Sequence, residues 1–416
     1  MTAVAVVLAG GRGTRSADPS QAKLAQEIGG ESLMHRHVDL LAGSEVHEAL
    51  VVAGHLGEQV QELCDGFDHP DVRVRVVHED EQRGTVAALR LAADETDADE
   101  FVVVLGDILM SFPVDDLLAR WRASGRRVAV AVHPSTHPED SDAAFPSHDG
   151  HVKVVAKSEP RDSIPNMSSA GLFAITREGL ASYATCRDVG SDVLPAAAAN
   201  GDLFAYVSSH YFKDTGTPHR LAAARSDYDS GAFARRGSLN RRPALFLDRD
   251  GVINPALPEV YEPEGYRLLP GVADAIHAAN AAGVPVLVVT NQPGIAKGFM
   301  TEQTHEAIRA RMDRLLGADS AFVDDYAYCP HHPDGGFDGE VPELKVACRC
   351  RKPAPGMLLD LAERHGIDLS RSVMVGDTDR DAGSAEAAGV AFIHAESTPD
   401  VGPSGAILRA IEVITC

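Results

Sequence analysis

The chain has 416 residues, so we expect two domains, since a single hydrophobic core rarely grows past about 300 residues. Hydrophobic residues make up 44% and charged residues 24%, as in ordinary globular proteins, and no apolar run approaches the roughly 20 residues of a membrane span. The 38 basic and 61 acidic residues give a net charge of −23, which opposes a broad surface for nucleic acid or anionic lipid, so a phosphorylated ligand would need locally placed basic residues or metal.

The N-terminus runs from an apolar stretch straight into a glycine loop, MTAVAVVLAGG, without the basic start and cleavage site of a secretory signal. We therefore expect a cytoplasmic protein. Short aliphatic runs then recur before polar or glycine turns and helix-like segments, which is the pattern of parallel strands joined by crossover helices. The predicted strands of this half are Val4–Leu8, Ala49–Val52, Val72–Val77, Phe101–Leu105 and Val128–Val132.

The first predicted strand leads into a loop rich in glycine and basic residues. Glycines let the backbone approach phosphates closely, while Arg15 and Lys23 can offset the charge of a triphosphate. The spacing fits neither a Walker A loop nor a dinucleotide GxGxxG motif, and an ordinary tight turn is the alternative interpretation of the glycines alone.

The run LAGGRGTR, with Lys23 after it, resembles the signature of sugar-1-phosphate nucleotidylyltransferases. Further matches follow in the family's order: GTVAAL from Gly84, LGD ending at Asp107, SAG from Ser169 and KDTGTP from Lys213. In that family a sugar 1-phosphate oxygen attacks the α-phosphorus of an NTP and pyrophosphate leaves, which calls for cations and oxygen-bound Mg²⁺. The resemblance implies Mg²⁺ at Asp107 and Asp214, phosphates at Arg15 and Lys23, and the nucleotide at Gly10, Gly11, Gly13, Thr14, Gly84 and Thr85.

Three features depart from the nucleotidylyltransferase pattern. Ser16 and Ala22 replace the usual Leu and Pro, and the sugar-site motif is present only as the scrambled run KSEP at 157–160. A second interpretation therefore stays open, in which this domain only senses or docks a nucleotide.

Apolar periodicity disappears over residues 229–242, where Gly, Ser and Arg gather, so this stretch is the predicted linker. The sequence thus predicts an α/β protein of two doubly wound, mostly parallel-sheet domains, 1–228 and 243–416. Ligands of such sheets bind outside the carboxyl ends of the strands, where polar motifs stand in this chain. The predicted strands of the second half are Ala244–Leu247, Val284–Val289 and Val373–Val375.

Two carboxylates, Asp248 and Asp250, follow the strand that begins the second half. One can face a phosphorus atom while the other transfers a proton. The runs TNQ from Thr290, RKP from Arg351 and GDTDRD from Gly376 follow in order, and this set resembles the haloacid-dehalogenase phosphohydrolases.

The haloacid-dehalogenase resemblance implies a role for each motif residue. Asp248 would be the nucleophile that forms an aspartyl-phosphate, and Asp250 the general acid and base. The transferring phosphoryl group would bind Thr290, Asn291 and Lys352, and Gln292 and Arg351 would be further substrate-binding residues. Mg²⁺ would be held by Asp248, Asp377 and the carbonyl of Asp250, while Asp381 could support the loop.

Three cysteines, Cys329, Cys348 and Cys350, cluster next to histidines. Three thiols and an imidazole make a tetrahedral zinc set, and a site filled by four protein ligands is structural. The family resemblance favours His331 as the fourth ligand, His332 is its rival, and reduced thiols without metal are a third interpretation. A zinc loop over 329–350 would position the lysine that follows it.

The combination DRDGVIN, TNQPGIAKG, CPHHP, CRCRKPAPGM and VGD is similar to the heptose 1,7-bisphosphate phosphatases, with the histidinol-phosphate phosphatases as the nearest rival. A phosphatase fused to a nucleotidylyltransferase suits a sugar that begins with two phosphates. We therefore expect the C-terminal domain to remove the 7-phosphate of D-glycero-D-manno-heptose 1,7-bisphosphate and the N-terminal domain to make an NDP-heptose.

We favour GTP as the donor, because the first domain looks most like heptose-1-phosphate guanylyltransferases. The expected cofactors are Mg²⁺ in both domains and structural Zn²⁺ in the second, and the expected partners are heptose phosphates and an NTP. The alternative is a histidinol-phosphate-type or other sugar-phosphate phosphatase with a non-catalytic, nucleotide-sensing first domain.

Overall fold

The structure is a computed structural model that describes residues 2–11, 18–135, 142–146, 151–159, 164–237, 240–256, 262–395 and 402–415. It divides into an N-terminal unit (Met1–His133, Asp140–Lys157 and Met167–Gly237) and a C-terminal unit (Pro134–Glu139, Ser158–Asn166 and Ser238–Cys416). Among the described helices, none combines the length and apolar character needed to cross a membrane.

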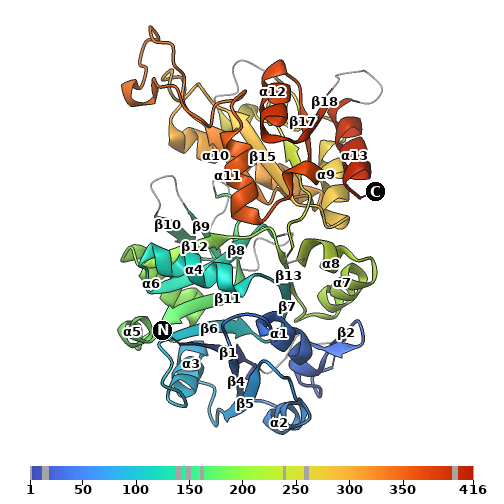
Figure 1. Ribbon diagram of the computed structural model, residues 1–416. Helices are drawn as coiled ribbons and strands as arrows, with labels where there is room; N and C mark the ends of the chain where they lie inside the picture. Colours follow the sequence, from blue (N-terminus) through green and yellow to red (C-terminus); the bar gives the residue numbers. More distant parts are fainter. Residues whose placement is uncertain are drawn as a thin grey trace. The chain divides into compact units, whose positions relative to one another are not determined.

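The N-terminal unit contains both strands and helices (Figure 1). Its strands are β1 (Ala3–Leu8), β2 (Glu27–Ile28), β3 (Glu31–Ser32), β4 (Glu48–Ala53), β5 (Arg73–His78), β6 (Glu100–Leu105), β7 (Ile108–Ser111), β8 (Val128–His133), β9 (Ala143–Pro146), β10 (Val152–Val155), β11 (Ser168–Thr176), β12 (Leu203–Val207) and β13 (Tyr211–Asp214). Its helices are η1 (Lys23–Ala25), α1 (Leu33–Leu41), α2 (Gly57–Asp65), α3 (Thr85–Ala93), α4 (Val114–Ser124), α5 (Arg177–Ser182), η3 (Val189–Val193), α6 (Leu194–Ala199), α7 (Pro218–Asp229) and α8 (Ala232–Gly237).

The main sheet of this unit runs in the order β10-β9-β11-β6-β1-β4-β5, and β8 pairs with both β11 and β12. Strand β1 pairs in parallel with β4 and β6, whereas β11 runs antiparallel to β6 and β8. The chain leaves β1 toward β4 and β5 and returns to β6 on the other side. The carboxyl ends of β1 and β6 therefore meet at a topological switch point, where open α/β sheets bind ligands.

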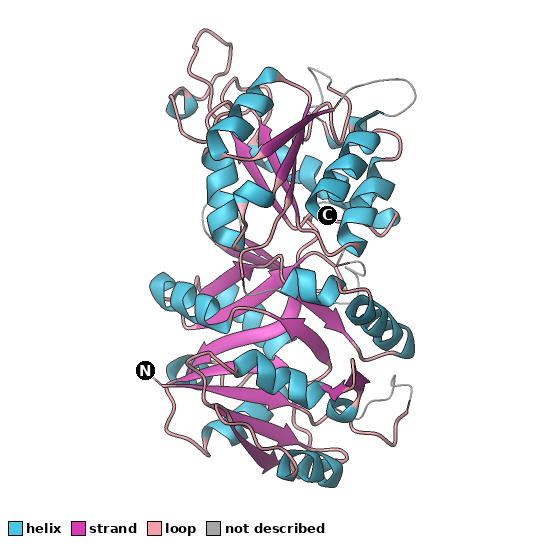
Figure 2. Ribbon diagram, turned by 45° about the vertical axis from the view of Figure 1, so that its right-hand side comes forward, coloured by secondary structure: helices cyan, strands magenta, loops and turns pink. Residues whose placement is uncertain are grey.

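Strand β1 shows how the sheet is covered on both faces. Successive side chains of a strand point to opposite faces, so Val4 and Val6 join one apolar core while Ala5 and Val7 join another. Apolar residues of α3, α5 and α6 complete the first core, and those of α1, α2 and α4 complete the second. Figure 2 shows the resulting layers, with strands between helices.

Helix α8 lies inside the stretch 229–242 that the sequence predicts to be a linker. The ring of Phe233 packs against Tyr211 and Tyr228, with centroids 5.1 and 5.6 Å apart. The hydroxyl of Ser111 donates to the carbonyl of Gly237 at 2.6 Å. The N-terminal unit therefore continues through the predicted linker as far as this glycine, because one aromatic residue anchors a segment whose composition is otherwise typical of a loop.

The C-terminal unit is a second α/β arrangement (Figure 1). Its strands are β14 (Leu245–Leu247), β15 (Val286–Asn291), β16 (Asp325–Cys329), β17 (Val373–Gly376) and β18 (Ala391–His394). Its helices are η4 (Pro263–Gly265), α9 (Val272–Ala281), α10 (Glu302–Ala318), η5 (Pro342–Leu344), α11 (Gly356–His365), η6 (Leu369–Arg371), α12 (Asp379–Ala388) and α13 (Gly402–Thr415).

The sheet of the C-terminal unit runs in the order β16-β15-β14-β17-β18, and each of these pairings is parallel. Apolar residues of α9, α10 and α13 cover one face and those of α11 and α12 cover the other. The predicted strands of both halves appear within two residues of their expected bounds, and the predicted α/β class with mostly parallel strands is confirmed. The switch point here lies between β14 and β17.

Candidate active sites

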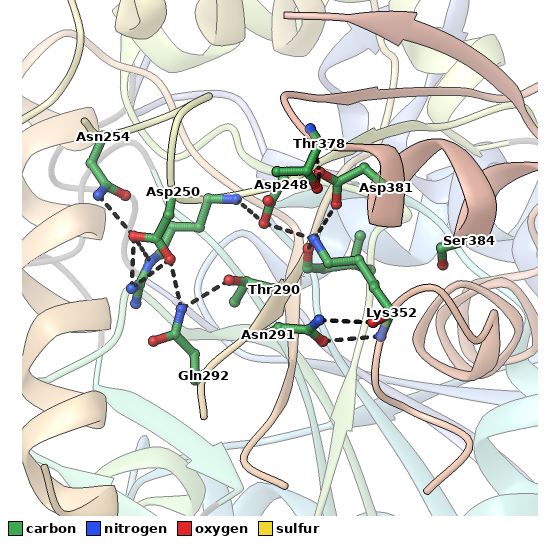
Figure 3. A network of polar contacts seen from close by, with 12 residues as sticks. Asp248, Asp250, Asn254, Thr290, Asn291, Gln292, Lys352, Thr378, Asp381 and Ser384 are labelled. Carbon is green, nitrogen blue, oxygen red and sulfur yellow. Dashed lines mark hydrogen bonds and ion pairs between the residues drawn. The ribbon is translucent and has the colours of Figure 1, made fainter. Parts of the chain in front are cut away.

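A polar site lies at the carboxyl ends of β14, β15 and β17 (Figure 3). Asp248 directly follows β14, and its amide donates to the carbonyl of Val375 on β17 at 2.9 Å. This bond joins the two strands that flank the switch point, so the carboxylate of Asp248 faces the site where ligands of this architecture bind. Burial raises the pKa of Asp248 above its ordinary value, against the attraction of the nearby Lys352.

Lys352 is buried between two carboxylates. Its Nζ lies 2.9 Å from Oδ1 of Asp248 and 2.5 Å from Oδ1 of Asp381, and it donates to the carbonyl of Val289 at 3.0 Å. The side chain of Asn291 bonds both the carbonyl and the amide of Lys352, at 3.1 and 3.0 Å. Burial alone would lower the pKa of Lys352, but the two carboxylates outweigh it and raise the pKa, so this ammonium is a fixed positive charge in the site.

The carboxylate of Asp250 is held by three side chains. Arg249 donates to both of its oxygens, at 3.0 and 2.9 Å, while Asn254 and Gln292 donate at 2.9 and 2.8 Å. The same Gln292 amide donates to the hydroxyl of Thr290 at 2.9 Å. Burial by itself would raise the pKa of Asp250, but the Arg249 guanidinium and these hydrogen bonds lower it below the ordinary value. Neither Arg249 nor Asn254 was predicted to be a site residue, although both stand in the DRDGVIN run.

Asp248, Asp377 and Asp381 can each offer one carboxylate oxygen, and these atoms lie within 4.8 Å of one another. Oδ1 of Asp377 is buried and has no hydrogen-bond partner among the described residues. Gly251, at φ +86°, lies so close that a Cβ there would overlap Oδ2 of Asp377. Burial, and then the charge of Asp381, raise the pKa of Asp377. Because Mg²⁺ prefers oxygen ligands, an orphaned carboxylate oxygen beside two further carboxylates fits that ion.

Asp381 is fully buried and joins helix α12 to the site. Its Oδ2 accepts from the amide and the hydroxyl of Thr378, at 3.1 and 2.6 Å, in a capping box. Its Oδ1 accepts from Lys352. The carboxylate of Asp381 therefore both caps the helix and holds the site lysine, whereas the sequence indicated only that it could support the loop.

The predicted zinc ligands Cys329, His331, Cys348 and Cys350 form one cluster, with a ligand atom of each within 4.8 Å of the others. The Sγ atoms of Cys329 and Cys348 are 3.5 Å apart, and Nδ1 of His331 lies 3.3 Å from Sγ of Cys350. Sulfurs bound tetrahedrally to zinc at about 2.3 Å lie about 3.8 Å apart, so the cluster is close to the size of a zinc site. The rival His332 turns instead to Asp334, with its Nδ1 3.3 Å from that residue's amide.

The cysteine cluster is connected directly to the polar site at the carboxyl ends of β14, β15 and β17. Cys329 ends β16, and Cys350 stands two residues before the buried Lys352. Arg351, between them in the chain, donates to the carbonyl of His331 at 3.2 Å. A filled cluster would therefore fix the backbone that presents the site lysine.

A second set of charged residues lies at the switch point of the N-terminal unit. Nζ of Lys23 is 2.5 Å from Oδ2 of Asp107, which follows β6. The amide of Thr215 donates to the carbonyl of Asp107 at 2.8 Å, which places the end of β13, with Asp214, beside it. A Cβ built on Gly216 would lie 2.9 Å from an Asp214 oxygen and 3.3 Å from an Asp107 oxygen. Two carboxylates and a lysine thus converge at this switch point.

The glycine loop is described only in part. Gly13, Thr14 and Arg15 lie outside the described residues, while the carbonyl of Gly10 accepts a hydrogen bond from the side chain of Gln82. The predicted nucleotide residue Thr85 uses its hydroxyl within the protein: it donates to Oδ2 of Asp188 and accepts from the amide of Val189, both at 2.8 Å.

Gly84, before α3, has a φ of +108°, and a Cβ there would overlap the carbonyl of Arg187. The backbone at this predicted nucleotide residue therefore requires glycine. Gly11 has open space around it, with nothing within 4 Å of a Cβ built there.

Comparisons with known proteins match each half of the chain to a different family. Residues 5–186 match the family model of the MobA-like NTP transferase domain, and residues 193–389 match that of the haloacid dehalogenase-like hydrolases. The D-glycero-beta-D-manno-heptose-1,7-bisphosphate 7-phosphatase of Rhodopseudomonas palustris is 45% identical over 153 residues, which are 37% of this chain and 83% of that one. Its counterpart in Escherichia coli K12 is 43% identical over 148 residues, 36% of this chain and 75% of that one.

Among solved structures, HddC from Yersinia pseudotuberculosis aligns with 55% of this chain and 100% of its own, at 21% identity and a TM-score of 0.46. The two family matches confirm the predicted kinds of domain, a nucleotidyltransferase and a haloacid-dehalogenase-type phosphatase.

Proposed function

Since this chain belongs to the family of D-glycero-beta-D-manno-heptose-1,7-bisphosphate 7-phosphatases, we propose that its C-terminal unit hydrolyses the 7-phosphate of D-glycero-D-manno-heptose 1,7-bisphosphate. We further propose that the N-terminal unit transfers a nucleotidyl group from an NTP to the resulting heptose 1-phosphate and releases pyrophosphate. The observation that carries the proposal is the buried Lys352, held between Asp248 and Asp381 at the switch point of a phosphatase fold. Such an enzyme of nucleotide-sugar synthesis would work in the cytoplasm, where NTPs are available.

The first step would use Asp248 as the nucleophile. One carboxylate oxygen forms a bond to phosphorus while the bond from phosphorus to the sugar oxygen breaks, and the protonated form of Asp250 gives its proton to that oxygen. Heptose 1-phosphate leaves, and the phosphoryl group remains on Asp248. Lys352 and the side chain of Thr290, both buried at the strand ends, would contact the phosphoryl oxygens.

The second step would return the enzyme to its starting state. Asp250, now a carboxylate, takes a proton from water as the water oxygen attacks phosphorus, and inorganic phosphate leaves Asp248. The hydrogen bonds from Arg249, Asn254 and Gln292 support the carboxylate form that this step needs. Mg²⁺ held by Asp248, Asp377 and the Asp250 carbonyl would neutralise phosphoryl charge, so that an anionic carboxylate can approach it.

The cysteine cluster would hold Zn²⁺ in a structural role. Three sulfurs and one imidazole nitrogen fill a tetrahedral shell, which leaves no position for a substrate. Its contribution to the reaction would be indirect, through the backbone that connects Cys350 to Lys352.

In the N-terminal unit, Asp107 and Asp214 would hold Mg²⁺, and Lys23 and Arg15 would bind the phosphates of the NTP. Lys23, which pairs with Asp107 at 2.5 Å, would exchange this partner for a phosphate when the nucleotide binds. Such positioning and charge neutralisation are what nucleotidyl transfer needs from a protein.

We propose GTP as the donor on the chemistry of Glu79. Its Oε2 would lie 3.0 Å from a Cβ built on Gly10, so the carboxylate lies over the glycine loop. Burial raises the pKa of Glu79, although a hydrogen bond from the Arg83 amide opposes this, and hydrogen bonds donated by a bound base would further favour the ionised form. An ionised carboxylate only accepts hydrogen bonds, and guanine offers two adjacent donors, N1–H and the 2-amino group, where adenine offers none at these positions.

One assay tests both proposals. Heptose 1,7-bisphosphate is incubated with each NTP in turn, and phosphate and pyrophosphate are followed separately. We expect phosphate release without any NTP, and pyrophosphate release with GTP only after phosphate has appeared. Histidinol phosphate is tested in parallel, and faster phosphate release from it would overturn the proposed substrate of the phosphatase. The absence of pyrophosphate with every NTP would indicate a nucleotide-sensing N-terminal domain.

A further inference from the structure

Arg249, the residue between the two site aspartates, has its charge buried. Its exposed fraction is only 2%, and its guanidinium Nη2 lies 3.0 and 2.9 Å from the two carboxylate oxygens of Asp250. Nε is 3.3 Å from the first of these oxygens. A planar guanidinium that contacts both oxygens restricts rotation of the carboxylate, which a single point charge would not do.

The guanidinium is itself held through another of its nitrogens. Its Nη1 donates to the hydroxyl of Tyr326 on β16 at 3.3 Å, and that hydroxyl lies 3.1 Å from Nε2 of His305 on α10. The guanidinium of Arg309, also on α10, lies over the Tyr326 ring at 5.2 Å from its centroid. Three buried side chains from separate elements therefore form a continuous chain that ends at the carboxylate of Asp250.

The backbone of Arg249 anchors the loop that follows it. Its carbonyl accepts from the amides of Ile253 and Asn254, at 2.8 and 3.1 Å. Asn254 in turn donates its side-chain amide to Asp250. The side chain of Asp250 remains 30% exposed while that of Arg249 is 3% exposed, so the carboxylate that the buried arginine holds is still accessible.

We infer that Arg249 is a positioning residue for proton transfer. Its guanidinium contacts both oxygens of Asp250 and is held in place by Tyr326, which in turn contacts His305. Arg249 thereby orients the carboxyl of Asp250 toward the leaving oxygen of the substrate. The inference rests on the proposed function of Asp250 as general acid and base. General acid catalysis requires the carboxyl to be within hydrogen-bond reach of the atom that it protonates. If Asp250 loses its orientation, the rate gain from general acid catalysis is therefore lost even though the carboxyl is present.

The test compares leaving groups that differ in their need for a proton. A sugar alkoxide must be protonated as it leaves, whereas p-nitrophenolate leaves unprotonated. Single-turnover rates with heptose 1,7-bisphosphate and the burst of p-nitrophenolate from p-nitrophenyl phosphate both report formation of the aspartyl-phosphate. For Arg249→Met we expect a loss of about 100-fold with the sugar phosphate and of less than about threefold in the burst, with KM nearly unchanged.

Conservative variants distinguish the orientation of the Asp250 carboxyl from the effect of the positive charge beside it. Arg249→Lys keeps the positive charge but lacks the planar guanidinium that contacts both carboxylate oxygens. With the sugar phosphate we therefore expect it to be only about tenfold faster than Arg249→Met. Tyr326→Phe removes the brace with little change in packing and should give a smaller loss with the same preference for p-nitrophenyl phosphate. Should Arg249→Met fail to fold, this tyrosine variant carries the test.

Two further variants distinguish an error in the proposed role of Asp250 from an error in the inference about Arg249. Arg242 is also buried, at 3% exposure, but its guanidinium donates to the carbonyl of His365, so Arg242→Met should not favour either leaving group. Asp250→Asn should reproduce the preference for p-nitrophenolate, and its failure to do so would overturn the proposed function of Asp250. If Asp250→Asn shows the preference and Arg249→Met slows both substrates equally, the positioning inference is wrong and the arginine is merely structural.

Discussion

The ammonium nitrogen of Lys352 lies 2.9 Å from the carboxylate oxygen Oδ1 of Asp248, a residue 104 positions earlier in the chain. The same nitrogen contacts Asp381, so the lysine keeps a carboxylate partner if the first is neutralised. This second partner allows the proposed nucleophile to be changed without leaving a buried charge unpaired, which would be strongly destabilising.

Asp248→Asn should therefore abolish phosphate release while the C-terminal unit stays folded. An amide cannot form the aspartyl-phosphate, whereas the N-terminal unit has its own charged site at Asp107. We expect pyrophosphate release from GTP and heptose 1-phosphate to be unchanged, as measured by coupled assays of the two products. Asp107→Ala is the reciprocal control and should stop pyrophosphate release alone. Loss of both activities in either variant would contradict two independent sites.

Gly251→Ala should weaken the binding of Mg²⁺ in the phosphatase. A Cβ at this position would overlap Oδ2 of Asp377, and the φ of +86° adds a strain that alanine tolerates poorly. We expect the Mg²⁺ concentration for half-maximal activity to rise about tenfold, as is usual when the support of a ligand is disturbed. The measurement is a Mg²⁺ titration of phosphate release, with part of the lost rate recovered at high Mg²⁺.

The matched control for this variant is Gly366→Ala. Gly366 also has a positive φ, +62°, but nothing lies within 4 Å of a Cβ built there. It should lower stability by about 1–2 kcal/mol without changing the Mg²⁺ requirement. Equal Mg²⁺ curves for both variants would mean that backbone strain, not contact with Asp377, determines the effect.

The sequence predicted the residues at strand ends better than the contacts between them. Asp248 could be identified because it directly follows a strand, and parallel strands bring their carboxyl ends to one edge, whereas Lys352 could be identified only from the short motif that carries it. Arg249 could not, because its partner Tyr326 is 77 positions away and only the folded packing of β16 brings the two together. For Asp381 the sequence indicated only a possible support of the loop, because its contact with Lys352, 29 positions earlier, forms only in the folded chain.

The antiparallel part of the N-terminal sheet was also missed. Strand β11, Ser168–Thr176, pairs antiparallel with β6 and β8, and its pairing with β8 shifts register between Ser169 and Phe173. This irregularity interrupts the alternation from which a strand is predicted. The region was therefore noticed only for its motif, while β1 and β6, with continuous aliphatic runs, were predicted within one residue of their ends.

Removal of the metal from the cysteine cluster should destabilise the C-terminal unit selectively. A structural zinc contributes directly to folding, because its site is not formed in the unfolded chain. The single tryptophan, Trp121, is buried in the N-terminal unit, so its fluorescence reports on that unit alone. We expect a zinc chelator to lower the thermal midpoint seen by circular dichroism while the tryptophan transition stays in place, and removal of Mg²⁺ to stop catalysis with little unfolding.

Cysteine variants provide the controls for this experiment. Cys348→Ser should reproduce the effect of the chelator and make further chelation ineffective. Cys186 is equally half-buried but belongs to the N-terminal unit, so Cys186→Ser should leave the response to the chelator intact. If the circular dichroism midpoint is unchanged by the chelator, the stability of the C-terminal unit does not depend on a metal held by the four residues of the cysteine cluster.

Asp325→Asn should destabilise the C-terminal unit in a pH-dependent manner. The buried Asp325 accepts from Nη1 of Arg364 at 2.7 Å and lies 2.9 Å from Nε2 of His365. Burial alone would raise the pKa of Asp325, but the hydrogen bond from His365 and the charge of Arg364 hold the pKa well below its ordinary value. Removing one partner of such a buried pair costs about 3–5 kcal/mol, which should appear in urea unfolding at pH 7 followed by circular dichroism.

The sign of the pH dependence follows from the lowered pKa. Unfolded Asp325 titrates near pH 4, so its stabilising contribution is complete above about pH 4 and is lost as the pH falls toward the folded pKa. The unfolding free energies of the wild type and Asp325→Asn should thus differ by a constant amount from pH 7 to about pH 5 and converge below about pH 4. The control is Asp360→Asn, which breaks an exposed 2.6 Å pair with Arg349 and should cost less than about 1 kcal/mol at pH 7. A gap that stayed constant into acid would mean that Asp325 contributes through packing and not through its charge.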